Sequence, residues 1–334
     1  MAEKHLYEIK HIETSFRTDG KMFKAIEDVS LYLNPGEIIG IVGESGSGKS
    51  VTMMSALQLI QEPGKVTGGE VYLDGNDKNM LEYGSNSAEV RKMRGGRVSM
   101  IFQEPMTSLN PVFRIGDQVD EVIALHYPEK SKEEVKARTL EMLEMVGIAN
   151  REGVYRMYPH ELSGGMRQRI MIAMALACDP KLIIADEPTT ALDVTIQAQI
   201  LDLLRSLKDR INSSIMLITH DLGVVAEMAD YVVVMYAGRV IEKGTAQEIF
   251  KDPRHPYTIG LMNSKPVVGK HVDKLYSIPG SVPNPINMPN YCYFRDRCEM
   301  CVDRCEGAYP GVYKVSPTHE VSCYRCMEGD TKNE

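Results

Sequence analysis

The residues best suited to chemistry form a short run rich in glycine and serine, which reads Gly43-Glu44-Ser45-Gly46-Ser47-Gly48-Lys49-Ser50. This run fits G-x-x-x-x-G-K-[ST], the pattern of a phosphate-binding loop, or P-loop. Its glycines allow backbone N–H groups to turn toward phosphate oxygens, and the positive end of a following helix adds to the attraction. Lys49 suits the β- and γ-phosphates of a nucleotide, and the Ser50 hydroxyl suits Mg²⁺. The sequence therefore predicts a nucleoside triphosphate site at residues 43–50 together with Val51.

The elements around the P-loop are the ones that such a site requires. Residues 37–42 form an apolar run of strand length before it, and residues 51–60 have the composition of a helix after it. A second apolar run of strand length, residues 181–185, ends in Asp186 and Glu187. Asp186 is predicted to hold Mg²⁺ through water, and Glu187 is predicted to act as the general base toward the attacking water.

Three further stretches carry polar residues that are predicted to join the same chemistry. Residues 162–169 read Leu-Ser-Gly-Gly-Met-Arg-Gln-Arg and open a helix, so Ser163 and the N–H groups after it form a second anion site. Gln103 and His220 each directly follow an apolar run of strand length. Side chains in that position lie at the carboxyl end of a strand, where ligands bind in open α/β sheets.

The periodicity of apolar residues predicts an α/β fold. Strands are expected at residues 5–16, 25–33, 37–42, 70–75, 97–102, 181–185, 215–219, 231–235 and 239–241. A helical region is expected over roughly 112–178, with a capping box at 131–134. One apolar helix face within it is made by Val135, Met142, Leu143 and Val146. Because strands of parallel type alternate with helices, we expect a largely parallel sheet.

Composition bounds the domains and the partners. From about residue 252 proline, asparagine, tyrosine and cysteine become frequent, so we predict a main domain over 1–251 and an appended domain over 252–334. The net charge of −8 argues against a partner that is nucleic acid. No apolar stretch reaches the about 20 residues needed to cross a bilayer, and the start lacks the pattern of a secretion signal. These features favour a soluble nucleotide-binding protein without a leader.

Taken together, the motifs resemble those of the ABC-type ATPases over residues 5–250. Residues 43–50 are similar to the Walker A loop, and residues 182–187 to the Walker B strand with its glutamate. Residues 162–168 resemble the LSGGQ signature, with methionine where glutamine is commoner. The resemblance implies a RecA-like core, an antiparallel β subdomain, and a helical subdomain at about 105–178.

The same resemblance implies roles for single residues. Residues 190–193 resemble the D-loop, Gln103 the Q-loop glutamine and His220 the switch histidine, which would bind the γ-phosphate and hold Glu187 in place. Phe16 stands where the family stacks an aromatic ring on adenine, with Phe23 as the alternative. Mg²⁺ would be held by Ser50, Gln103 and Asp186.

In the family two such domains enclose two ATP molecules between them. The residues that would act on the ATP of the partner subunit are Ser163, Gly164, Gly165, Gln168 and Asp193. Only one set of motifs is present in this chain. It is therefore expected to pair with a copy of itself or with a sister ATPase.

Four segments resemble one branch of the family, the dipeptide and oligopeptide importers: residues 103–111, 253–258, 278–285 and 292–298. The resemblance implies an ATPase subunit at the cytoplasmic face of the membrane. Its partners would be two membrane permease subunits and, indirectly, an external peptide-binding protein. Two alternatives stay open: a nickel importer of the same branch, and an ABC ATPase outside transport whose tail senses metal.

Six of the seven cysteines gather in the last part of the chain, and Cys178 stands apart. The family pattern takes Cys292, Cys298, Cys305 and Cys323 as a set, spaced C-x5-C-x6-C-x17-C. Four thiolates suit either tetrahedral zinc or an iron–sulfur cluster. The C-x2-C pairs that Cys301 and Cys326 complete keep zinc open, whereas the resemblance implies a four-iron, four-sulfur cluster. The cluster is expected to contribute to the fold of the tail rather than to the ATP chemistry.

Overall fold

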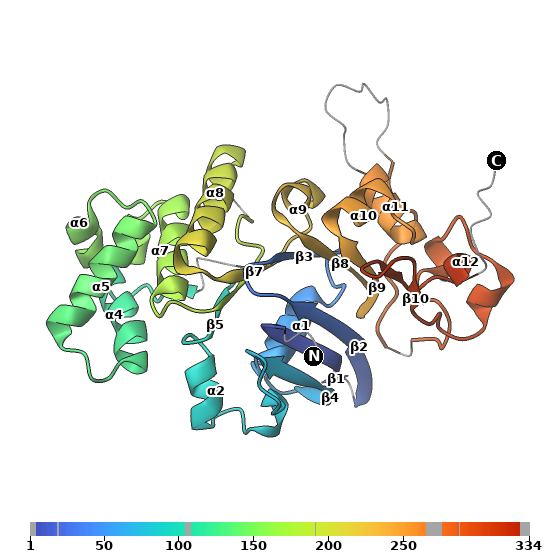
Figure 1. The fold of residues 1–334 in the computed structure, drawn as a ribbon, viewed down its shortest axis with the longest axis horizontal. Helices are drawn as coiled ribbons and strands as arrows, with labels where there is room; N and C mark the ends of the chain where they lie inside the picture. The colour runs from blue at the N-terminus through green and yellow to red at the C-terminus, as the bar shows by residue number, and fades with distance from the viewer. Residues whose placement is uncertain are drawn as a thin grey trace. The chain divides into compact units, whose positions relative to one another are not determined.

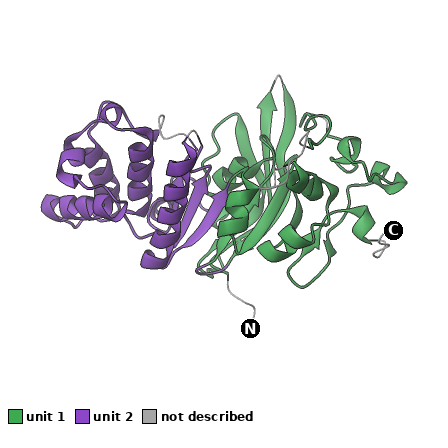
Figure 2. Ribbon diagram, turned by 90° about the horizontal axis from the view of Figure 1, so that it is seen from above, with its two compact units in different colours: residues 1–33, 37–82, 219–334 green, residues 34–36, 83–218 purple. Residues whose placement is uncertain are grey.

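The computed structural model describes residues 5–18, 20–103, 108–190, 192–264, 276–286 and 288–327. The chain divides into two compact units, shown in different colours in Figure 2. Unit 1 comprises residues 1–33, 37–82 and 219–334, and unit 2 comprises residues 34–36 and 83–218. The P-loop belongs to unit 1, and the strand that ends in Asp186 belongs to unit 2. Residues on both sides of the predicted boundary at 251 lie in unit 1.

Unit 1 begins with an antiparallel sheet of three strands. These strands are β1 (Tyr7–Thr18), β2 (Lys21–Leu33) and β4 (Gly64–Leu73), and their order is β2-β1-β4 (Figure 1). The strand β4 begins six residues earlier than the sequence predicts. Buried residues recur along β1, and bulges shift the register of its pairing with both β2 and β4.

The second set of strands in unit 1 has the order β10-β11-β9-β8-β3. It consists of β3 (Ile38–Val42), β8 (Tyr231–Tyr236), β9 (Arg239–Thr245), β10 (Tyr313–Lys314) and β11 (Glu320–Val321). The strands β3 and β8 pair in parallel and are buried throughout, as continuous apolar runs in parallel sheets are. The tail strand β11 pairs with β9, so the tail extends this set of strands.

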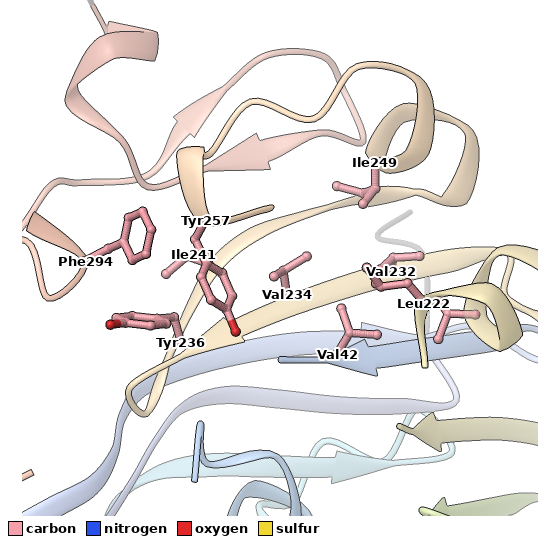
Figure 3. Packing of buried hydrophobic residues seen from close by; sticks show 10 residues of the cluster. Val42, Leu222, Val232, Val234, Tyr236, Ile241, Ile249, Tyr257 and Phe294 are labelled. Atoms are coloured by element: carbon pink, nitrogen blue, oxygen red, sulfur yellow. The ribbon is translucent and has the colours of Figure 1, made fainter. Parts of the chain in front are cut away.

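The helices of unit 1 are short and cover the strands. They are α1 (Lys49–Ala56), α9 (Leu222–Met228), α10 (Ala246–Lys251), α11 (Pro256–Asn263) and α12 (Tyr324–Met327), with 3-10 turns η1 (Met80–Glu82), η3 (Arg295–Arg297) and η4 (Asp303–Glu306). Figure 3 shows one core cluster, in which Tyr236 of β8, Tyr257 of α11 and Phe294 of the tail come together. Burying an aromatic ring of this size contributes about 1.5–3 kcal/mol. The tail is therefore anchored in the core of unit 1 through apolar contacts.

Unit 2 contains three parallel strands in the order β7-β6-β5 and a group of helices. The strands are β5 (Val98–Ile101), β6 (Leu182–Asp186) and β7 (Ser214–Ile218). The helices are α2 (Ala88–Met93), α4 (Ile115–His126), α5 (Lys132–Met145), α6 (Arg151–Arg156), α7 (Gly164–Leu176) and α8 (Val194–Ile211), with the 3-10 turn η2 (Pro159–Glu161). Every residue of β6 and β7 is buried.

The predicted helical region is present as four separate helices, α4 to α7. The capping box at the start of α5 is confirmed, since Ser131 accepts from the Glu134 N–H and the Glu134 carboxylate accepts from the Ser131 N–H. The predicted apolar face is buried at Val135, Met142, Leu143 and Val146. None of the helices that the structure describes is both long and apolar enough to span a bilayer.

Candidate functional site

The P-loop lies in unit 1, where β3 leads into it and α1 leads away from it. Gly46 and Gly48 have φ angles of 77° and 97°, which favour glycine. A Cβ atom on Gly48 would lie 2.7 Å from Cγ2 of Ile26 on the neighbouring strand β2. Backbone conformation and close approach therefore both require glycine here. The loop ends at the N-terminus of α1, where backbone N–H groups are available to phosphate.

Lys49 folds back across the loop. Its ammonium group donates to the carbonyl oxygens of Gly43 at 2.8 Å and Glu44 at 3.0 Å, and lies 3.5 Å from the Ser47 hydroxyl. The residue is only 6% exposed. The carbonyl oxygens of the loop therefore hold the ammonium group of Lys49 at the P-loop. This arrangement suits the phosphates of a nucleotide.

The two candidates for stacking on a base lie side by side. Phe16 of β1 and Phe23 of β2 are cross-strand partners, and their rings stack at a centroid distance of 5.9 Å and an interplanar angle of 21°. Both rings are half-buried. The choice between them stays a prediction, because either ring could take the outer position against a base.

His220 stands beside the strand that leads to the P-loop. The backbone N–H of Thr219 donates to the carbonyl oxygen of Ile41 in β3 at 3.2 Å. His220 follows directly and is exposed, and Asp221 then caps α9 by accepting from the Gly223 N–H. The role of His220 as the switch histidine stays a prediction.

In unit 2 the strand β6 delivers the two predicted carboxylates. Asp186 is its last residue and is 4% exposed. Glu187 has a φ angle of 45°, in the left-handed region that a glutamate rarely adopts. Such a conformation costs about 1–3 kcal/mol and is typical of functional sites. It is held by the bond from the Glu187 N–H to the carbonyl oxygen of Ile218, at 2.9 Å.

The Glu187 carboxylate is fixed by two donors. Oε2 accepts from Nε2 of Gln103 at 3.0 Å and from the Thr190 hydroxyl at 2.8 Å. Gln103, predicted as a Mg²⁺ ligand, therefore lies against the predicted general base in this structure. Thr190 was assigned only to the predicted D-loop, and its contact with Glu187 was missed. The spacing of three residues between them is the signal that could have found it. A carboxylate oriented in this way suits a general base.

The signature run begins α7 with an exposed turn. The Ser163 side chain caps the helix by accepting from the Met166 N–H at 3.3 Å, and Ser163 and Gly164 are both exposed. A Cβ on Gly165 would lie 3.0 Å from Ile196 of α8. Asp193 caps α8, with Oδ1 accepting from the Ile196 N–H at 3.0 Å. The turn thus presents its N–H groups at the surface of unit 2.

Gln168 is placed differently from the other residues predicted to act on the ATP of the partner subunit. It is 1% exposed, and its Nε2 has no hydrogen-bond partner within the described part of the chain. A contact with ATP bound to another subunit would require this side chain to move. Of the predicted segments, residues 104–107 of the importer motif and Ala191 of the D-loop lie outside the described residues.

The cysteines do not form a ready metal site. Among the residues that the structure describes, which include all six tail cysteines, no group of three or more His, Cys, Asp or Glu side chains could hold a metal ion. The expected iron–sulfur or zinc site at Cys292, Cys298, Cys305 and Cys323 is therefore not supported by this arrangement.

Two residues of the tail reach the P-loop. The guanidinium of Arg297 contacts both carboxylate oxygens of Glu44, at 2.7 and 3.0 Å. The Tyr257 hydroxyl accepts from the Glu44 N–H at 2.8 Å. The sequence does not predict these two contacts, because composition says nothing about where a single side chain ends.

Comparison with known families places two segments of the chain. Residues 26–190 match the family described as "ABC transporter". Residues 241–305 match the family described as "Oligopeptide/dipeptide transporter, C-terminal region". The second match spans Tyr257, Arg297 and three of the four predicted cluster cysteines.

Similar proteins cover nearly the whole chain. The oligopeptide transport ATP-binding protein AppD of Bacillus subtilis is 48% identical over 320 residues, which are 96% of each chain. The dipeptide transport ATP-binding protein DppD of Lactococcus lactis is 48% identical over 96% of this chain and 90% of its own length. Among solved structures, the dimeric ATP-binding cassette MJ0796 bound to ADP and Pi has a TM-score of 0.63 at 30% identity, covering 72% of this chain and 98% of its own.

Proposed function

Because this chain belongs to the family of ABC transporter ATP-binding proteins, we propose that it hydrolyses ATP to drive an importer of dipeptides or oligopeptides. One observation carries the proposal. Relatives with these two names are each 48% identical over 96% of this chain. The likeness therefore includes the tail, where residues 241–305 match the peptide-transporter region. A general ATP-binding cassette would be expected to match in the main domain alone.

The roles of single residues in this function are part of the proposal. Lys49 binds the phosphates, and Ser50 and Asp186 hold Mg²⁺. Glu187 takes the proton of the attacking water, and Gln103 and Thr190 keep its carboxylate oriented by their hydrogen bonds. His220 senses the γ-phosphate. The exposed cap of α7 supports a further role for Ser163, which is to contact ATP bound to a second subunit.

The assembly follows from the family. The chain pairs with a copy of itself or a sister ATPase and acts at the cytoplasmic face of a membrane, against two permease subunits. We also propose the finer division of the fold: an antiparallel subdomain built from β1, β2 and β4, a helical subdomain at about 105–178, and a tail from residue 252. The four-iron, four-sulfur cluster at the four cysteines stays a prediction, which rests on the family resemblance alone. Iron analysis of anaerobically purified protein tests it.

Uptake measurements test the proposed function. Cells that lack this chain should fail to accumulate a labelled dipeptide or oligopeptide. The wild-type chain should restore uptake, and a Lys49→Ala chain should not, because it lacks the charge that binds the phosphates. Labelled nickel serves as the contrast within the same strains. Unchanged peptide uptake after deletion, or restoration by Lys49→Ala, would overturn the proposal.

A further inference from the structure

The tail and the P-loop meet at one residue, Glu44. Both carboxylate oxygens of Glu44 accept from the guanidinium of Arg297, across 253 positions of sequence. Both residues belong to unit 1. The Arg297 side chain is 6% exposed and that of Glu44 is 27% exposed. A two-point contact between a planar guanidinium and a carboxylate fixes direction as well as distance. Ion pairs that are shielded from water are also screened less than those at the surface.

Several groups hold the Arg297 side chain in place. Its Nε donates to the carbonyl oxygen of Pro279 at 2.7 Å, and Nη1 donates to the Tyr236 hydroxyl at 3.3 Å. The guanidinium also lies 5.7 Å from the ring centre of Tyr236 and 5.9 Å from that of Phe294. These two rings pack edge to face in the core of unit 1, at a centroid distance of 5.3 Å and an interplanar angle of 85° (Figure 3). These contacts fix the position and orientation of the Arg297 guanidinium beside Glu44.

Glu44 also contacts Lys49, the lysine proposed to bind phosphate. The Glu44 side chain is held by Arg297, and its N–H is held by the hydroxyl of Tyr257 at 2.8 Å. Its carbonyl oxygen accepts from the ammonium group of Lys49 at 3.0 Å. A single residue, Glu44, therefore makes both the contact with the tail and the contact with the lysine. A shift of the Glu44 backbone would displace an oxygen that positions the charge of Lys49.

A second path joins the tail to the same loop. The Tyr293 hydroxyl donates to Oε2 of Glu27 on β2 at 2.8 Å. The Glu27 N–H donates to the carbonyl oxygen of Gly238 at 2.9 Å, and the Gly238 N–H donates to the carbonyl oxygen of Ser47 at 3.0 Å. The tail therefore contacts the P-loop directly at Glu44 and is linked to Ser47 indirectly, through Glu27 and Gly238.

We propose that Arg297 is a positioning residue for the P-loop, and that its contact with Glu44 sets the affinity of the chain for Mg-ATP. The proposal rests on the proposed function, in which the P-loop binds ATP. Arg297 touches no nucleotide in this role. Two tail residues, Tyr257 and Arg297, contact Glu44 directly, and the carbonyl oxygen of Pro279 helps to hold Arg297 in place.

A double-mutant cycle on the full chain tests the proposal. The variants are Arg297→Met, Glu44→Ala and the double variant, and the readout is the Kd for Mg-ATP measured by calorimetry. Each single change should weaken binding about tenfold, within the range of coupling between residues in contact. The double variant should be no weaker than either single variant, because the second change removes a contact that is already lost. Arg297→Lys should recover part of the affinity, since it keeps the charge and loses the fork.

Arg295→Met is the matched control. Arg295 lies in the same 3-10 turn, but it pairs with Asp296 at 2.9 Å and with Glu306, both of which belong to the tail. This variant should bind Mg-ATP as wild type does. Thermal melting of every variant separates affinity from folding, and binding is measured well below the lowest midpoint. If Arg297→Met does not fold, Glu44→Ala carries the test, because it leaves the packing of the tail intact.

The outcomes are distinct. Wild-type affinity in a folded Arg297→Met or Glu44→Ala chain would overturn the proposal, as would losses that multiply in the double variant. Equal weakening by Arg295→Met would also overturn it, because the effect would then belong to the tail as a whole. Wild-type protein that binds no Mg-ATP would instead overturn the proposed function.

Discussion

The P-loop of unit 1 and the signature turn of unit 2 are both glycine-rich runs that end at a helix N-terminus, but they are held in different ways. In the P-loop, Ser47 and Lys49 are buried, and Glu44 is tied to a side chain 253 positions away. At the signature turn, Ser163 is exposed and caps its own helix. The first run is fixed by distant parts of its own unit. The second is fixed locally, and its residues Ser163 and Gly164 are exposed.

The largest difference between the two runs is expected when one glycine in each is replaced by alanine and nucleotide binding is measured. Gly48→Ala should abolish nucleotide binding, because the residue has a φ angle of 97° and the new Cβ would lie 2.7 Å from Ile26. The conformation alone costs about 1–2 kcal/mol for an L-residue. In the matched variant Gly164→Ala, Leu192 is the only described residue that the Cβ would meet, at 3.8 Å. Calorimetry should show that this chain binds Mg-ATP as wild type does, and equal losses in both variants would contradict the comparison.

Ser163→Arg should separate binding from hydrolysis. The substitution places a bulky cation at the exposed turn and leaves the P-loop of the same chain untouched. Hydrolysis should be abolished while each subunit still binds Mg-ATP, since the lost contact belongs to the partner's nucleotide. Phosphate release and nucleotide binding are measured on the same preparation. A parallel loss of both would show that the turn supports its own subunit.

Glu187→Gln should lower the rate of hydrolysis by about 10²-fold or more, the usual effect of removing a positioned general base. Affinity for Mg-ATP should be kept, because Lys49, Ser50 and Asp186 are unchanged. Single-turnover kinetics measure the chemical step directly. As a control, Thr190→Val removes one of the two donors to the carboxylate and should cause a smaller loss. Hydrolysis near the wild-type rate in Glu187→Gln would exclude this residue as the base.

The smallest expected effect concerns pH and Glu27, the β2 residue that accepts from the Tyr293 hydroxyl. Burial raises the pKa of Glu27, but hydrogen bonds from Lys24, Tyr293 and Arg239 outweigh it and lower the pKa from 4.5 to about 2. The carboxylate therefore adds stability above pH 4.5, and this contribution is lost as the pH falls toward about 2. Thermal midpoints of wild type and Glu27→Gln should differ at neutral pH and converge in acid. A difference that does not depend on pH would contradict this assignment.

The sequence predicts the local parts of the site and misses the distant contacts. The P-loop, the strand before Asp186 and the capping box of α5 are encoded by neighbouring residues, so pattern and spacing suffice. The bond from Gln103 to Glu187 joins strands that are far apart in sequence, and no periodicity encodes it. The contact of Arg297 with Glu44 is of the same kind.

The tail shows the limit of composition most clearly. Residues 286–326 contain few aliphatic side chains, which led to the expectation of a segment that a metal must hold together. One residue, Phe294, enters the core of unit 1, and the short strand β11 pairs with β9. Counts of residue types miss both, because a single well-placed ring and two backbone pairs are enough to attach a segment. The sequence shows the spacing of the cysteines. It does not show that, among the described residues, their side chains form no group that could hold a metal ion.

The pairing of β11 with β9 also protects the chain against self-association through an open strand edge. Residues Glu320 and Val321 lie opposite Lys243 and Glu242, and the Ser322 N–H donates to the carbonyl oxygen of Ile241 at 2.8 Å. These bonds cover polar backbone groups that would otherwise form an open strand edge. An open edge is a template for another chain, and edge-to-edge pairing is a common route to aggregation. A chain cut before β10 would therefore be expected to self-associate through β9, even though every residue of the P-loop is still present.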